Sequence, residues 1–279
     1  MRALALVAVT LGLVTPAAAS PTTDAWLTGL TDRVIGDLAA GKRLVVEVHV
    51  PLCDNTIIRC GNPKLGDGDS PATNLYWATS PGFGHWFKRR HSGWTEVSVD
   101  TEHTGDADVL ETRTYRRTIA TPAAWRERGA PRRYELEVVV HAWRGSAIDR
   151  ALAAYARDIS GKGSAAQLVA FVGHNRLMDL DEFTWPAPGK LAQGAIAIAC
   201  ATAPYMKDEV PAATRVPLLM TSDLLFANAA PLEAAVLAFA RGGGYAKIRR
   251  DAAIAYAGVQ NRPVARVLRT FTNPADRRW

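Results

Sequence analysis

Apolar positions along the chain follow two periods, one typical of helices and one typical of strands. Ser146 and Asp149 have the spacing of a capping box, which predicts the start of a helix at 147. The run Gly242–Gly244 separates the last two helices, because glycine stops a helix. The predicted helices span 24–39, 147–159, 231–241 and 245–257.

The predicted strands are of two kinds. The first kind is short and largely apolar, which is typical of strands in the centre of a parallel sheet covered by helices. These strands span 44–52, 168–172, 195–199 and 216–220. The second kind alternates polar and apolar residues, as strands do when one face is exposed. These strands span 94–100, 111–119 and 134–142, and the first two are expected to form a hairpin or edge strands.

Strands and helices alternate along most of the chain, which predicts an α/β fold. The expected architecture is a three-layer sandwich, a mainly parallel sheet with helices on both faces and an antiparallel excursion near 94–119. Of the 279 residues, 48% are hydrophobic and 22% are charged, which is enough apolar material for a packed core. This composition excludes a disordered chain, a collagen-like protein and a disulfide-dominated miniprotein.

The first twenty residues have the pattern of a secretory signal. Met1 and Arg2 precede an apolar stretch of about a dozen residues, and the small residues Ala17–Ala19 follow. We therefore expect a signal peptide over 1–19, one domain over 20–279, and a secreted or periplasmic protein. No later apolar run reaches the length of about eighteen residues that a membrane span needs, so no integral span is expected.

Three cysteines fit an oxidising compartment. Cys53 and Cys60 are separated by the segment DNTIIR, and a disulfide across this short loop is expected. Cys200 is then left without a partner. It is either a small buried side chain in an apolar strand or a retained, reactive thiol.

A histidine and this remaining cysteine follow two neighbouring apolar strands. His174 comes after strand 168–172, and Cys200 comes after strand 195–199. Catalytic groups of α/β proteins gather at the carboxyl ends of such strands, and two parallel strands joined by one crossover usually lie side by side. The two side chains are therefore expected at one edge of the sheet, where a histidine can accept the proton of a thiol.

The segments that carry these residues, LVAFVGHN and AIAIAC, resemble the catalytic blocks of the caspase and gingipain type of cysteine peptidase. That group includes legumain, separase and the bacterial CHAT domains. The segment VHVPLCDN also resembles the family's first strand, so the likeness extends over about 44–220 in the order of elements. Asn175 departs from the family pattern, in which Gly is usual. The segments CDN, NLYW, VGHN and AC also resemble those of a group of exported bacterial proteins.

The resemblance implies a caspase-like fold and a cysteine hydrolase that acts on a peptide or protein substrate. His174 would be the general base and Cys200 the nucleophile. The amide of Gly173 or the backbone of Cys200 would stabilise the oxyanion.

A substrate pocket is implied by the same resemblance. Asp54, with Asn55 beside it, follows the first strand, where the family commonly shapes its pocket. With Asp179 or Asp181 nearby, an acidic pocket would favour Lys or Arg at the cleaved bond. The alternative for Asp54 is an Asx turn that ends the strand.

A second hypothesis is a catalytically inactive binding module of the cell envelope that uses an aromatic surface. Five aromatic residues over 74–87 suggest this surface, although such a cluster is also typical of a satellite core. They are Tyr76, Trp77, Phe83, Trp86 and Phe87. Loss of activity in a Cys200→Ala variant would distinguish the peptidase from this module.

Metal binding and nucleic-acid binding are not expected. The six histidines show no H-x-x-x-H pair and the cysteines no C-x-x-C pattern, so neither a metal nor another cofactor is expected. Lys and Arg number 33 against 27 Asp and Glu, a net charge of +6. The basic residues are scattered among acids, which indicates a solvated surface or contact with anionic envelope polymers.

Overall fold

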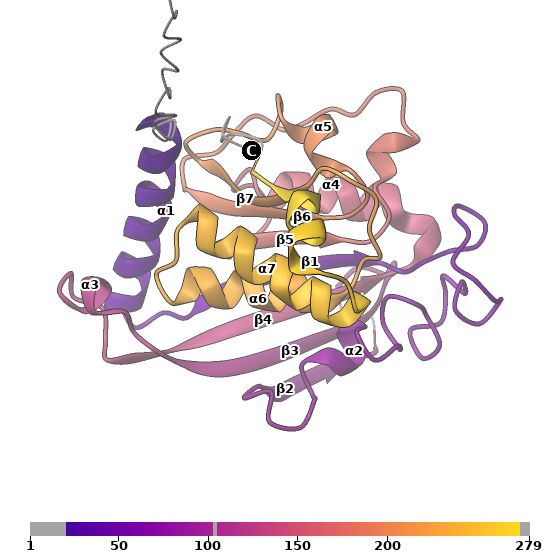
Figure 1. The fold of residues 1–279 in the computed structure, drawn as a ribbon, viewed down its shortest axis with the longest axis horizontal. Coiled ribbons are helices and arrows are strands. Elements are labelled where there is room, and N and C mark those ends of the chain that lie inside the picture. The colour runs from indigo at the N-terminus through magenta and orange to yellow at the C-terminus, as the bar shows by residue number, and fades with distance from the viewer. Residues whose placement is uncertain (1–20, 103–104, 274–279) are drawn as a thin grey trace, which may run out of the picture.

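The computed structural model describes residues 21–102 and 105–273. Eight strands within these residues pair into one sheet (Figure 1). The order across the sheet is β2-β3-β4-β1-β5-β6-β7-β8. The strands are β1 (Leu44–Pro51), β2 (Thr95–Asp100), β3 (Val109–Ala120), β4 (Arg133–Trp143), β5 (Leu168–Val172), β6 (Gln193–Ile198), β7 (Arg215–Thr221) and β8 (Phe271–Thr272). The signal peptide predicted over 1–19 lies outside the described residues.

Most of the sheet is parallel. The central strands β4, β1, β5, β6 and β7 run parallel to one another. At one edge β2 pairs antiparallel with β3 and β3 with β4, and at the other edge β8 pairs antiparallel with β7. These pairings confirm the α/β class, the mainly parallel sheet and the antiparallel excursion.

Helices cover both faces of this sheet. Alternate side chains of β5 explain why, because successive residues of a strand point to opposite faces. Leu168, Ala170 and Val172 pack in one hydrophobic core with α1, α6 and α7, whereas Val169 and Phe171 pack in a second core with α4 and α5. The helices are α1 (Pro21–Ala39), α2 (Phe83–Trp86), α3 (Ala123–Arg126), α4 (Ile148–Asp158), α5 (Thr202–Met206), α6 (Ala229–Ala240), α7 (Tyr245–Gln260) and α8 (Val264–Val267).

The start of α4 differs from the prediction of a capping box. A 3-10 turn over Gly145–Ala147 leads into the helix, and the N-cap residue, Ala147, makes no side-chain hydrogen bond. The turn already orders the backbone here, because the amide of Ala147 donates to the carbonyl of Arg144. Ser146 and Asp149 therefore do not form the reciprocal bonds of a capping box.

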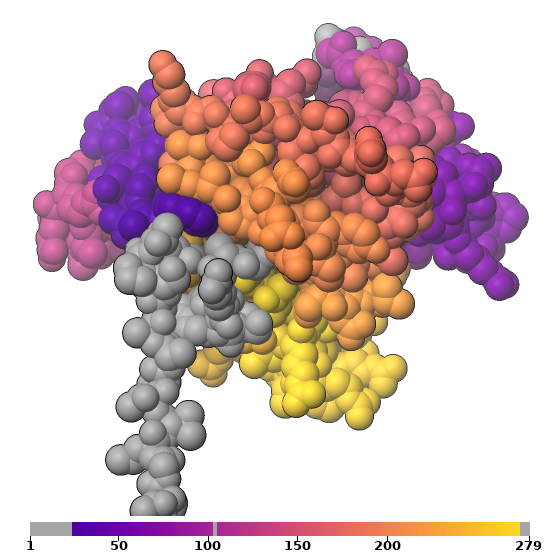
Figure 2. All heavy atoms as spheres, turned by 90° about the horizontal axis from the view of Figure 1, so that it is seen from above, coloured from indigo at the N-terminus to yellow at the C-terminus, as the bar shows by residue number. Residues whose placement is uncertain are grey.

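The long connections lie at the ends of the sheet. The loop that follows β1 lies at the opposite end of the molecule from α1 (Figure 1), and both views agree on this. The segments that follow β5 and β6, coloured salmon to orange, form a large part of the face seen in Figure 2. These connections carry the residues that the sequence marks as chemically interesting.

Candidate functional site

The structure places His174 and Cys200 just beyond the ends of two adjacent parallel strands. Val172 of β5 is in register with Ile198 of β6, and the amide of Gly173 donates to the carbonyl of Ile198 at 3.3 Å. Each strand therefore ends at the same level, and the next residues emerge at the same edge of the sheet. The adjacency of the two strands was predicted and is confirmed.

Asn175 ties the two strand ends together. This side chain is 1% exposed, and its Nδ2 donates to the carbonyl of Cys200 at 2.8 Å. It is the residue that departs from the Gly of the family pattern. In this chain the departure supplies a buried amide that holds the backbone after β5 against the backbone after β6, so it fixes the position of the candidate nucleophile relative to the candidate base.

The imidazole of His174 is held by a carboxylate. Its Nε2 lies 2.6 Å from Oδ2 of Asp179, and the side chain of His174 is 13% exposed. A carboxylate only accepts, so Nε2 carries a proton and Nδ1 keeps its lone pair in the neutral ring. Oδ2 of Asp179 also lies 3.5 Å from Nη1 of Arg176. Nε of the same arginine lies 2.5 Å from Oδ1 of Asp149. Asp179 thus contacts the imidazole, a role that the sequence did not suggest.

Cys200 carries a free thiol that is half-buried. Its Sγ lies 3.5 Å from the carbonyl of Leu225, to which the thiol donates. The resting thiol is therefore paired with a carbonyl, while the imidazole of His174 is paired with a carboxylate. The two groups share one edge of the sheet, and their hydrogen bonds among the described residues go to these other partners.

The backbone directly after Cys200 is strained. Ala201 has φ 46°, in the left-handed region, which costs a non-glycine residue about 1–2 kcal/mol. Its amide donates to the carbonyl of Asp223 at 3.0 Å. The next turn is fixed by Thr202, whose amide donates to Oγ1 of Thr221 at 3.1 Å. Strain of this kind gathers at functional sites, where the surrounding structure holds it in place.

Two tyrosines have pKa values that Cys200 affects. Burial raises the pKa of Tyr76 well above its usual range, and the neighbouring Cys200 raises it further. Burial also raises the pKa of Tyr256, and Cys200 raises it further. The hydroxyl of Tyr256 accepts a hydrogen bond from the amide of Phe226 at 2.8 Å. Tyr76 and Phe226 have ring centroids 6.5 Å apart. Tyr76, from the loop after β1, and Tyr256, from α7, are thus near enough to Cys200 to feel its charge.

The amide of Gly173 is not available as an oxyanion donor in this structure, because it donates within the sheet to Ile198. The backbone of Cys200 remains as the other predicted donor. Gly173 serves a packing purpose, since a Cβ at this position would lie 3.2 Å from Cγ of Pro51 at the end of β1. The ends of β1 and β5 thus approach closely at the same edge.

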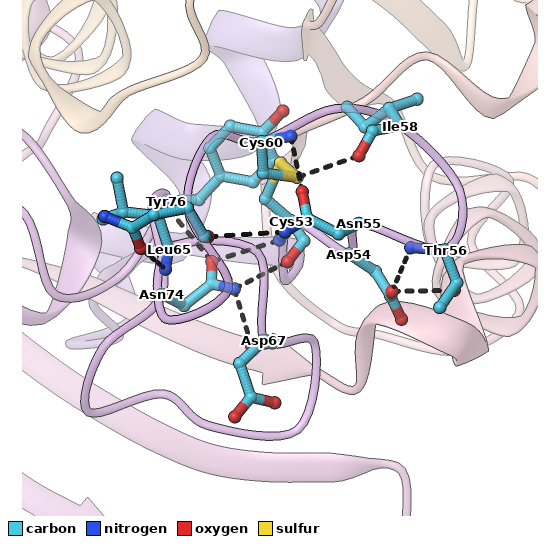
Figure 3. The surroundings of a disulfide bond; sticks show 11 residues. Cys53, Asp54, Asn55, Thr56, Ile58, Cys60, Leu65, Asp67, Asn74 and Tyr76 are labelled. Atoms are coloured by element: carbon cyan, nitrogen blue, oxygen red, sulfur yellow. Dashed lines mark hydrogen bonds between the residues drawn. A yellow bond between two sulfur atoms is a disulfide. The ribbon is translucent and has the colours of Figure 1, made fainter.

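Cys53 and Cys60 form the predicted disulfide, with their Cα atoms 5.9 Å apart (Figure 3). Asp54 lies in this loop, and its Oδ1 accepts from the amide of Thr56 at 2.8 Å and from the Thr56 hydroxyl at 2.7 Å. The alternative role of Asp54, an Asx turn, is therefore present. Asn55 is also used within the loop, where its Oδ1 accepts from the amide of Cys60 at 2.9 Å.

The four proposed pocket residues differ in their surroundings. Asp54 and Asn55 bond within their own loop, Asp179 bonds to His174, and Asp181 is exposed. A role of these residues in binding substrate stays a prediction.

The aromatic cluster is part of the core. Tyr76, Trp77, Phe83 and Phe87 are buried, and Trp86 is half-buried. Its indole Nε1 donates to Oε2 of Glu233 at 2.7 Å. These side chains pack inward, as a hydrophobic cluster does, so they do not form the exposed aromatic surface that the binding-module hypothesis requires.

The structure contains a second polar cluster that was not predicted from the sequence. Glu47 and His49 of β1 and Asp158 at the end of α4 bring potential ligand atoms within 4.8 Å of one another. His49 and Asp158 are buried. A signal was present, because Glu47 and His49 are polar residues at alternate positions of an otherwise apolar strand, and such residues share one face.

Within 21–102 and 105–273, no helix combines the length and the apolar character that crossing a bilayer requires. Comparison with known proteins gives no match: no family model matches the chain, and no curated protein or solved structure matches it.

Proposed function

We propose that this protein is an exported cysteine hydrolase of caspase-like architecture, a peptidase that uses Cys200 as nucleophile and His174 as general base. The observation that carries the proposal is the imidazole of His174, held by Asp179 at 2.6 Å, at the edge of the sheet where the free thiol of Cys200 follows the adjacent strand. Asp179 acts as a positioning residue. It directs the unprotonated Nδ1 of His174 away from itself and stabilises the ring once it is charged.

The reaction follows from these roles. Nδ1 of His174 takes the proton of the Cys200 thiol, and the thiolate attacks the carbonyl carbon of the scissile amide. The imidazolium then gives this proton to the leaving amine as the C–N bond breaks, which leaves a thioester on Cys200. A water molecule, deprotonated by His174, hydrolyses the thioester, releases a carboxylate and restores the thiol.

Two further features support the proposal. The left-handed backbone at Ala201 fixes the residue beside the nucleophile, as strained backbones do at functional sites. The Cys53–Cys60 disulfide agrees with export to an oxidising compartment, which the signal pattern predicts for the protein.

The rate of alkylation of Cys200 by iodoacetamide tests the dyad, because only the thiolate reacts. We expect the ratio of the rate at pH 6 to the rate at pH 9 to fall at least about tenfold in His174→Ala, since the thiol loses its proton acceptor. Asp179→Asn should lower the same ratio. Glu182→Gln is the matched control, because Glu182 is an exposed carboxylate three residues along the chain from Asp179, and it should leave the ratio unchanged. An unchanged ratio in His174→Ala refutes the dyad.

Peptide hydrolysis tests the reaction itself. The mature protein should cleave a fluorogenic peptide library, and Cys200→Ala should abolish cleavage while the circular dichroism spectrum and the unfolding temperature stay the same. Cleavage after Lys or Arg at no higher rate than after neutral residues contradicts the acidic pocket. Cleavage that persists in Cys200→Ala contradicts the proposed nucleophile.

A further inference from the structure

A cavity of about 450 Å³ lies on the α4 side of the sheet, where α4 ends above β1 and β4. Its inner wall is formed by Glu47, His49, His141, Trp143 and Asp158. None of the residues placed in the proposed dyad lines it. The exposed residues Gly105, Arg157 and Gly163 stand at its rim. The volume lies in the range of about 300–1,000 Å³ that is typical of pockets for small molecules.

The register of the sheet brings the polar residues of the inner wall together. Thr112 of β3, His141 of β4 and His49 of β1 are paired across the three strands, so their side chains stand on one face. The two imidazole rings stack with centroids 5.7 Å apart. Nδ1 of His141 lies 3.0 Å from the Thr112 hydroxyl, and its Nε2 lies 3.1 Å from Oε1 of Glu47.

The hydrogen bond from Trp143 determines which ring nitrogen of His49 carries the proton. The indole Nε1, which only donates, is 3.1 Å from Nδ1 of His49, so Nδ1 must carry the lone pair. The proton of His49 is therefore on Nε2, which is 2.9 Å from Oδ2 of Asp158. His49 is held as a neutral ring that donates to Asp158. It does not cancel the charge of this carboxylate.

Glu47 stays ionised in the cavity. Burial by itself raises the pKa of Glu47, but hydrogen bonds from His141 and Ser164, together with attraction to the charged form of His141, outweigh burial and lower this pKa to about 2. The nearest guanidinium to Asp158 belongs to Arg157, whose Nε is 4.0 Å from Oδ1 and whose side chain is 60% exposed. Asp100 and Asp106 also line the cavity, so its described lining carries four carboxylates against one guanidinium, that of Arg157, and the imidazoles of His49 and His141.

The two carboxylates differ in how far they open onto the cavity, because the side chain of Glu47 is 23% exposed and that of Asp158 is 5% exposed. Gly163 lies against Asp158, and a Cβ at this position would come within 1.8 Å of Oδ1. Only glycine therefore allows the backbone to approach this carboxylate so closely. Val109, Ala154 and the ring of Trp143 also line the cavity and give it apolar surface next to the acidic residues.

We propose that this cavity binds a primary ammonium ion on an aliphatic stem, with Glu47 and Asp158 as its acceptors and the apolar wall beside the stem. Their ligand atoms are at most 4.8 Å apart, a span that one ammonium nitrogen bridges with two hydrogen bonds of about 2.8 Å. A divalent metal is disfavoured, because metal ligation needs the lone pair of His49 on Nε2 and the indole of Trp143 keeps it on Nδ1. The proposal does not depend on the peptidase activity.

Isothermal titration of the mature protein with n-pentylamine at pH 7 and low salt tests the proposal. We expect binding of n-pentylamine, no binding of 1-pentanol, which has the same stem without the charge, and no binding of Zn²⁺. Glu47→Gln and Asp158→Asn should each weaken the binding of n-pentylamine about tenfold or more, since each removes one charged acceptor. The control is Glu135→Gln, a half-buried carboxylate of β4 outside the cavity, and it should not change the affinity.

Several outcomes would overturn the proposal. Equal affinity for 1-pentanol and n-pentylamine would show an apolar pocket, and tight Zn²⁺ binding without amine binding would show a metal site. Unchanged affinity in both cavity variants would place the amine elsewhere. If neither variant folds, the comparison of the amine, the alcohol and Zn²⁺ on the wild-type protein still decides between these possibilities. Alkylation of Cys200 should be unaffected by Glu47→Gln, which separates this test from that of the dyad.

Discussion

Replacing Asn74 by alanine should destabilise the protein strongly, because this buried side chain organises the loop that follows β1. Its Oδ1 accepts from the amides of Cys53 and Tyr76, each at 3.1 Å. Its Nδ2 donates to the carbonyls of Cys53 at 2.8 Å and Asp67 at 2.9 Å (Figure 3). Asn74 is 0% exposed, so water does not replace these partners without rearrangement of the loop.

The expected loss follows from these four hydrogen bonds. At about 1 kcal/mol for each lost bond, Asn74→Ala should lower the free energy of unfolding by about 4 kcal/mol. For a chain of this size, the unfolding temperature should fall by about 8–16 °C. Urea titration with the disulfide intact measures the free energy, and differential scanning calorimetry measures the temperature.

A matched control lies in the same loop. Asn62 is exposed, and its Oδ1 accepts one hydrogen bond, from the amide of Leu65 at 3.0 Å. Asn62→Ala should cost less than about 1 kcal/mol. If Asn74→Ala costs no more than Asn62→Ala, the reasoning that buried backbone groups of this loop depend on the amide of Asn74 is refuted.

Two further predictions concern the disulfide and the loss of folding stability at low pH. The Cys53–Cys60 bond spans a sequence separation of 7, for which the loss of chain entropy predicts about 2.4 kcal/mol of stabilisation. The double variant Cys53→Ser/Cys60→Ser should therefore unfold about 5–10 °C lower in a calorimetric scan, and an unchanged temperature would contradict this estimate. The pKa of Glu47 is lowered from 4.5 to about 2, so its carboxylate stabilises the folded state above pH 4.5 by about 3 kcal/mol and loses this contribution as the pH falls toward 2. Urea titrations of wild type and Glu47→Gln should differ most above pH 4.5 and converge near pH 2, and a constant difference would exclude the carboxylate as the cause.

Much of the fold was predictable because burial leaves a local pattern. Strand 168–172 was predicted with the observed bounds, since all five of its residues are apolar and all are buried. The alternation over 134–142 also matches the observed burial of β4. The helix stop predicted at Gly242–Gly244 is confirmed, because Gly242, with φ 77°, follows the end of α6.

Elements without a pattern of their own were missed. α5 has five residues and β8 has two, so neither is long enough to show a period. The secondary structure of the stretch 74–87 was not predicted, because its aromatic side chains are buried by contacts with distant strands. Tyr115 of β3, for example, stacks on Phe87 with centroids 4.9 Å apart.

For the candidate site, local sequence patterns were enough to predict which side chains lie at the carboxyl edge of the sheet. His174 and Cys200 each follow a short apolar strand, and strand ends are a local property that periodicity reveals. The contacts of these side chains depend on how the whole chain packs. Asp179 and Asp181 look alike in the sequence, but the turn over Arg176–Met178 brings only the first to the imidazole of His174.

The same division holds for the cavity below α4. The alternation of β1 placed Glu47 and His49 on one face, which the sequence already contained. Their meeting with Asp158, 109 positions after His49, depended on the order of the strands and on where α4 ends. Local burial preferences set the elements, whereas long-range contacts are set by packing of the whole chain, and only the folded molecule contains that information.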